Sequence, residues 1–183
     1  MDMYNPIKLM VEAFDAHGLK YRVDETDRLQ VIHAGFGVRN GPTVDVQFIS
    51  AGERNDVMVR IVNLVNNVPA EKRGKLLEVC NTLNNKYRFF KFNMNPDNNI
   101  LVEYDLPVNT GNDCLGEAAF EIFVRIIQIL NENYIVIAKA LYIEDEPAPD
   151  GRADPELLKL LKDNHDEINI KISKTAPSGE DGK

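Results

Sequence analysis

The residues that could do chemistry in this chain of 183 residues are few, and their spacing decides what they could do. The three histidines, His17, His33 and His165, lie far apart and match no metal-ligand spacing. The two cysteines, Cys80 and Cys114, match neither a zinc site nor a disulfide framework. We therefore predict no metal, no cofactor and no catalytic residues, and we expect that the protein is not an enzyme.

Each cysteine lies on a predicted helix. Cys114 falls in the first turn of a long helix, where the helix dipole can activate a thiol. Asp113 and Glu117 oppose that effect, and no histidine is close in sequence to act as a base. We predict an inert thiol at Cys114, buried or half-buried. Cys80 lies on the apolar side of its helix, which indicates a core position.

Residues 86–92 read KYRFFKF and interleave basic with aromatic side chains, as RNA-binding strands do. The glycine of the usual motif is missing, however, and the chain has a net charge of −8. Phosphate binding needs clustered Lys and Arg. We instead predict a strand with Phe90, Phe92 and Met94 facing the core, and no nucleic-acid partner.

Two further segments resemble ligand sites only superficially. Residues 35–41, GFGVRNG, follow a strand, but a strand rather than a helix comes next, so the phosphate-binding fingerprint is not matched. Residues 146–157 hold an Asp-Gly pair at the relative positions of a calcium loop, but Ala148 and Leu157 occupy ligand positions. We predict a hairpin loop for the first segment and no calcium site for the second.

Hydropathy patterns predict the elements that hold these residues. In residues 44–48, apolar side chains alternate with polar ones, which is the pattern of a strand with one wet face. The predicted helices cover residues 6–17, 69–83 and 115–143, and the predicted strands cover residues 19–23, 29–34, 44–48, 57–65, 87–94 and 100–105. The order α-β-β-β-β-α-β-β-α predicts an α+β fold, with an antiparallel sheet packed by helices.

Composition indicates one globular domain followed by an acidic extension. The hydrophobic fraction of 44% and charged fraction of 27% are typical of a globular domain. We place that domain at residues 1–146 and the extension at residues 147–183, with a short helix near residues 154–162 and a disordered end. Residues 144–183 hold 11 acidic and 6 basic side chains, a net charge of −5 out of the −8 of the whole chain. The first residues lack the features of a signal peptide, and we expect a cytoplasmic protein.

The predicted long helix has more apolar surface than one sheet face can cover. Apolar side chains span roughly 200° of its helical wheel, and its charged residues exclude a membrane span. The helix is either enclosed between the sheet and the other helices, or one side of it faces a second subunit or partner. The polar stripe comprises Glu117, Glu121, Arg125, Gln128, Glu132 and Lys139. The candidate interface residues are Ile122, Phe123, Ile126, Ile129, Leu130 and Ile137.

Residues 6–143 resemble one known family. The resemblance rests on the helix start Val68-Pro69, on LLEVCNTLNNKYRFFKF and DNNILVEYDLP, and on the long apolar helix. The sequence resembles the putative bacterial sensory-transduction regulators, whose fold is similar to that of class I type III secretion chaperones. The resemblance implies a compact α+β domain that forms homodimers and binds proteins rather than catalysing reactions. The extension after residue 146 departs from that pattern.

We therefore expect a non-enzymatic, homodimeric protein-binding module, chaperone-like or regulatory in role. It would bury an apolar segment of its partner, with strand addition at a sheet edge as a further route. The alternative is a small-ligand sensor or an enzyme with a pocket between sheet and helices. That alternative needs polar groups converging in an apolar cleft, and the sequence shows no such pattern.

Overall fold

The computed structural model describes residues 4–52, 56–107 and 114–143. The chain divides after Tyr142 into two units, and the elements below belong to the first. The predicted short helix near residues 154–162, the predicted disordered end and His165 lie outside the described residues. The predicted domain boundary at residue 146 stays a prediction.

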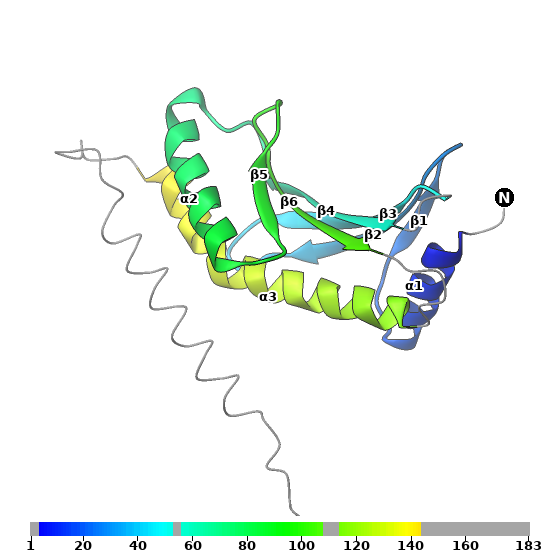
Figure 1. Cartoon of the computed structure of the whole chain (residues 1–183). Coiled ribbons are helices and arrows are strands. Elements are labelled where there is room, and N and C mark those ends of the chain that lie inside the picture. Colours follow the sequence, from blue (N-terminus) through cyan, green and yellow to red (C-terminus); the bar gives the residue numbers. More distant parts are fainter. Residues whose placement is uncertain (1–3, 53–55, 108–113, 144–183) are drawn as a thin grey trace, which may run out of the picture. The chain divides into compact units, whose positions relative to one another are not determined.

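One six-stranded sheet organises the described domain (Figure 1). Its strand order is β1-β2-β3-β4-β6-β5, and every neighbouring pair is antiparallel. The strands are β1 (Arg22–Glu25), β2 (Gln30–Gly37), β3 (Thr43–Ser50), β4 (Asp56–Val65), β5 (Lys91–Met94) and β6 (Ile100–Pro107), and the α-helices are α1 (Asn5–Ala16), α2 (Arg73–Lys86) and α3 (Leu115–Tyr142). The predicted α+β fold and its element order are confirmed.

The helices cover one face and one edge of the sheet. α1 and α3 lie against the same face, and α2 lies beside the edge strand β5 (Figure 1). The predicted alternation explains the covered face, because Val44, Val46 and Phe48 are buried while their neighbours in β3 are half-buried or exposed. The covered face therefore forms the hydrophobic core.

The two ends of α3 contact different helices. Near its start, Gly116 lies so close to α1 that an added Cβ would be 2.8 Å from the Cβ of Ala13. Near its end, the buried Asn133 side chain donates to the Tyr87 hydroxyl at 2.7 Å and accepts from Lys86 of α2 at 3.3 Å. The sheet, α1 and α2 therefore cover most of the apolar side of α3, while its polar side stays exposed. No helix in the ranges that the structure describes is long and apolar enough to cross a membrane.

Several predicted boundaries were wrong. The strand predicted over residues 87–94 is shorter, because α2 continues to Lys86 and β5 begins only at Lys91. The first strand begins at Arg22 rather than at residue 19. Pro69 precedes a 3₁₀ turn, Ala70–Lys72, instead of opening α2 itself. These differences lie at element ends, where local pattern says least.

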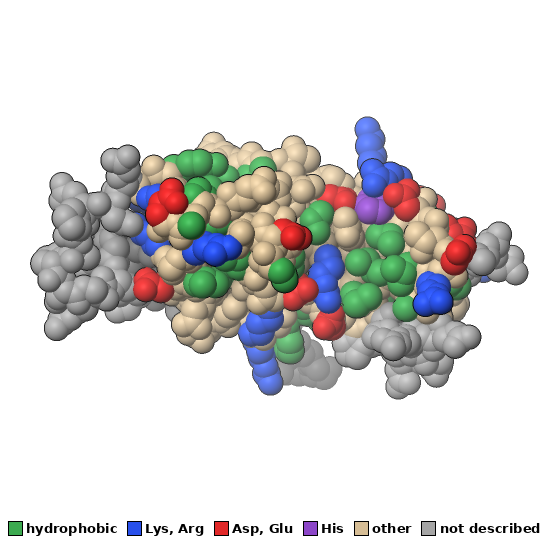
Figure 2. Space-filling model, turned by 90° about the horizontal axis from the view of Figure 1, so that it is seen from above, with side chains coloured by type: hydrophobic (Ala, Val, Ile, Leu, Met, Phe, Trp, Pro, Cys, Tyr) green, Lys and Arg blue, Asp and Glu red, His purple; other side chains and the backbone are tan. Residues whose placement is uncertain are grey.

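The sheet face opposite α1 and α3 is half-buried and carries ion pairs that cross the strands. His33 lies between Asp24, at 3.3 Å, and Asp45, at 2.7 Å. Arg60 contacts Glu103 at 2.9 Å and Asp105 at 3.1 Å. Figure 2 shows this face, where apolar patches alternate with charged side chains. Oppositely charged side chains that face each other on neighbouring strands stabilise a sheet.

Candidate binding groove

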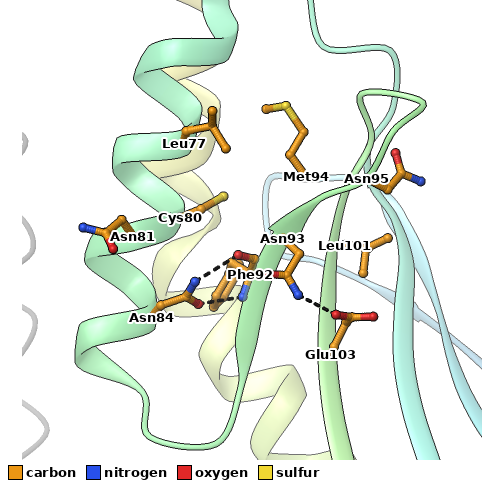
Figure 3. Close-up of a pocket in the computed structure, with 10 residues that line it drawn as sticks. All are labelled: Leu77, Cys80, Asn81, Asn84, Phe92, Asn93, Met94, Asn95, Leu101 and Glu103. Atoms are coloured by element: carbon orange, nitrogen blue, oxygen red, sulfur yellow. Dashed lines mark hydrogen bonds between the residues drawn. The ribbon is translucent and has the colours of Figure 1, made fainter.

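A groove lies between α2 and the β5–β6 hairpin, with a volume of about 510 Å³ (Figure 3). Leu77 of α2 and Met94 of β5 point toward each other across it (Figure 3). Leu77 is 50% exposed, although it is a large apolar side chain. The lining residues are Leu77, Cys80, Asn81, Asn84, Phe92, Asn93, Met94, Asn95, Leu101 and Glu103.

Helical spacing brings the α2 side of the groove together. Cys80 and Asn81 follow Leu77 by three and four residues, and Asn84 follows them by four and three, which places all four on one side of the helix. The other face of α2 is anchored in the core by Leu76, which is fully buried. The groove is therefore held by a packed helix and not by a loop.

Asn84 joins α2 to the outer edge of β5. Its Oδ1 accepts from the Phe92 amide at 2.7 Å, and its Nδ2 donates to the Phe92 carbonyl at 3.1 Å (Figure 3). These are the two bonds that the backbone of a neighbouring strand would make. The Asn84 side chain therefore takes the place of a neighbouring strand at this position.

The groove presents little net charge. Glu103, the charged residue in its lining, is paired with Arg60 at 2.9 Å and also accepts from the Asn93 side chain. Burial raises the pKa of the Cys80 thiol to about 11, so this group is neutral near neutral pH. The polar part of the lining consists mainly of asparagine amides, which both donate and accept hydrogen bonds.

Asparagines also fix the hairpin that forms one end of the groove. The Asn99 amide donates to Asn95 Oδ1 at 2.8 Å, and Asn99 Oδ1 accepts from the Asn67 amide at 2.8 Å. Asn67 and Asn98 have positive φ angles of 55° and 60°, which asparagine tolerates better than most residues. These contacts link the β5–β6 turn to the segment that precedes α2.

The predicted interface residues of α3 do not line this groove. Phe123, Ile126, Ile129, Leu130 and Ile137 are buried within the single chain, and Ile122 is half-buried. Within the single chain these residues are therefore covered by the sheet and the other helices, as the first of the two explanations for the long apolar helix predicted. An interface role for them stays a prediction, since no second chain is present. The predicted polar stripe does lie outward: every member is exposed except Lys139, which is half-buried.

The two cysteines differ in their surroundings. Cys80 is 3% exposed, as its core prediction requires. Cys114 is exposed, so its predicted burial was wrong. The helix begins one residue later, and Leu115 takes the buried position. Among the residues that the structure describes, no group of three or more His, Cys, Asp or Glu side chains could hold a metal ion.

In the basic aromatic segment, residues 86–92, some aromatic side chains are buried and others are exposed. Phe90 and Phe92 are buried as predicted, while Phe89 is 62% exposed. Met94 is half-buried and lines the groove rather than the core centre. The sequence pattern missed this groove because nothing in the spacing of Leu77 and Met94 shows that α2 lies against β5.

Comparison with known proteins identifies the family. A search of curated proteins returned no match. The family model YbjN, described as a putative bacterial sensory transduction regulator, matches residues 6–135. That range includes the whole described sheet, both sides of the groove and most of α3. The chain therefore belongs to the YbjN family of putative bacterial sensory transduction regulators.

Proposed function

We propose that this protein is a regulatory module that works as a homodimer and binds a segment of another protein in the groove between α2 and β5. Its family is described as one of putative sensory transduction regulators, which supports a role through interaction. The observation that carries the proposal is the exposed Leu77 opposite Met94 in a groove rimmed by amides.

The chemistry of the groove favours a neutral polypeptide segment. Apolar side chains of Leu77, Met94 and Leu101 can receive an apolar side chain of the partner. Asparagine amides on the rim, such as those of Asn81 and Asn95, match the donors and acceptors of a peptide backbone. The pairing of Glu103 with Arg60 leaves little free charge to attract an ionic ligand.

We also propose a chaperone-like fold and a cytoplasmic location for this module. The fold proposal rests on the chaperone-like fold that the family resemblance of the sequence implies. Fractionation of cells that produce the full chain, followed by immunodetection, tests the location: recovery in the membrane or periplasmic fraction would contradict it.

A photo-crosslinking experiment tests the groove. A photoreactive amino acid at Asn81, on the rim, should capture a partner in cells, and mass spectrometry of the crosslinked peptide identifies the captured segment. The matched variants are Leu77→Asp and Ile135→Asp, since these residues are 50% and 48% exposed and lie on different helices. Capture should fall at least tenfold with Leu77→Asp and stay unchanged with Ile135→Asp.

Equal loss with both variants would contradict the groove proposal, as would capture of segments without apolar side chains. The small-ligand alternative has its own test. A metabolite that binds only the folded state raises the melting temperature, and one that did so for wild type but not for Leu77→Asp would favour that alternative over peptide binding.

A further inference from the structure

The strand β1 forms the second edge of the sheet, and its residues lie open. Among the described residues β1 pairs only with β2, and all four of its residues are exposed. Val23 is 37% exposed, although its side chain projects toward the face that α1 and α3 cover. β1 contains no proline, so its backbone can accept another strand.

The register shows which backbone groups point outward. The Thr26 amide donates to the Leu29 carbonyl at 2.8 Å, and this pair continues the β1–β2 register beyond Glu25 and Gln30. Backbone groups alternate in direction along a strand. Val23 and Glu25 therefore direct their amide and carbonyl groups away from β2, toward the free side.

The opposite edge is closed to the same kind of pairing. The Phe92 backbone in β5 is already bonded to Asn84, and α2 lies alongside. Strand addition to this sheet is therefore favoured at β1.

We propose that β1 pairs antiparallel with β1 of a second copy, centred on Val23, so that the two sheets become continuous. In this register the two Val23 residues exchange backbone hydrogen bonds. Arg22 then lies opposite the second copy's Asp24, on the same face, and the symmetry creates this pair twice. The charged side chains of β1 in one copy are thus complementary to those of β1 in the second copy.

A shifted register is less favourable. Pairing Val23 with Glu25 of the second copy would place the two Asp24 carboxylates directly opposite each other, and like charges in that position destabilise a sheet. Within the single chain Arg22 contacts Asp24 at 3.2 Å, and both side chains are more than half exposed. This exposed pair can therefore exchange partners at little cost. Asp24 has a second contact within the chain, with His33 at 3.3 Å. The two exposed Val23 side chains would bury each other.

Charge reversal tests this contact between the two β1 strands. The contact rests on the proposed homodimer, because it is the surface through which the two copies would associate. Light scattering with size-exclusion chromatography should show a wild-type dimer at tens of micromolar. Arg22→Asp and Asp24→Arg should each weaken dimerisation at least tenfold, because each places like charges opposite each other in a homodimer. Mixing the two variants should restore a dimer, since a heterodimer has opposite charges at both positions. Native mass spectrometry identifies that heterodimer.

Arg28→Asp is the matched control, because Arg28 is exposed in the turn after β1 and carries the same charge change. It should leave the dimer intact. Circular dichroism must show native folding for each variant, and a variant that unfolds is replaced by Val23→Pro, which removes the outward amide of Val23, a group that does not bond to β2, together with its valine side chain.

The outcomes separate this interface from the wider proposal. A wild-type monomer overturns both the homodimer and the β1 contact. A dimer that both charge variants leave unchanged, or that their mixture fails to restore, overturns the β1 contact alone. Capture of a partner at Asn81 reports on the groove separately, and it should persist in Arg22→Asp.

Discussion

Two helical glycines illustrate how one side chain can decide a packing contact. An added methyl group at Gly116 would lie 2.8 Å from the Cβ of Ala13 and closer still to the Leu9 carbonyl. At Gly74 in α2, nothing lies within 4 Å. Gly116→Ala should therefore lower the free energy of unfolding by about 2 kcal/mol, whereas Gly74→Ala should raise it by roughly 0.5–1 kcal/mol. Urea denaturation measures both changes, and similar effects at the two positions would contradict the close contact between α1 and α3.

The buried thiol of Cys80 predicts a loss of stability in alkali. Burial raises its pKa from 9.0 to about 11. A group with a raised folded pKa contributes stability that is complete below its unfolded pKa and is lost as the pH passes the folded value. Relative to Cys80→Ala, wild type should therefore lose about 2 kcal/mol of stability between pH 9 and pH 11. Urea denaturation at several pH values gives that difference.

Thiol labelling gives the matching control. Cys114 is exposed and should react with a thiol reagent in the folded protein, while Cys80 should react only after unfolding. Equal rates for both cysteines in folded protein at pH 8 would contradict the burial of Cys80.

Single residues were the hardest part of the fold to predict. The sequence places Asn84 near the end of a helix, but pattern alone cannot show that its amide meets Phe92 eight residues later. Positive φ angles at Asn63, Asn67 and Asn98 likewise depend on the tertiary path of the chain. Apolar periodicity was a better guide, because burial of Cys80 follows from the side of the helix on which it lies.

The burial of α3 makes a sharp prediction at the scale of the element. Ile126 is 1% exposed and Ile135 is 48% exposed on the same helix. Ile126→Asp should unfold the domain, because a buried unpaired carboxylate costs several kcal/mol. Ile135→Asp should change stability by less than about 1 kcal/mol. Circular dichroism measures both. A folded but monomeric Ile126→Asp would instead make that side of α3 the dimer interface.

The sequence predicted which side of α3 is exposed to solvent, but it did not predict which elements cover the apolar side. The polar stripe from Glu117 to Lys139 was predicted because it depends only on helical spacing. The wide apolar arc had two explanations, and the choice between them needed the positions of α1 and α2. Those positions depend on contacts between residues far apart in sequence, such as Lys86 with Asn133.

At the scale of the whole molecule, the described elements should fold without the acidic extension. The core lies between the sheet and the helices α1, α2 and α3, all within residues 5–142. A chain shortened to residues 1–146 should keep its cooperative unfolding and its melting temperature to within about 4 °C, which corresponds to less than about 1 kcal/mol. Loss of cooperative unfolding would show that the extension belongs to the domain.

Removing the Asn84 side chain should change how the whole molecule associates. Asn84→Ala frees the amide and carbonyl of Phe92, and unpaired strand edges recruit further strands. Light scattering should then detect species larger than a dimer that increase with time. Asn85→Ala, at the exposed neighbouring position, should not form them. Large species in both variants would rule out the edge as their origin.

The Asn84 contact has a consequence for the size that an assembly can reach. A subunit with two available ends that fit each other can add copies without limit and form a filament. When a subunit's own side chain occupies one edge of its sheet, the subunit can join a neighbour only through the other edge. Growth then stops at a closed pair, so one amide group would separate a finite complex from a fibre.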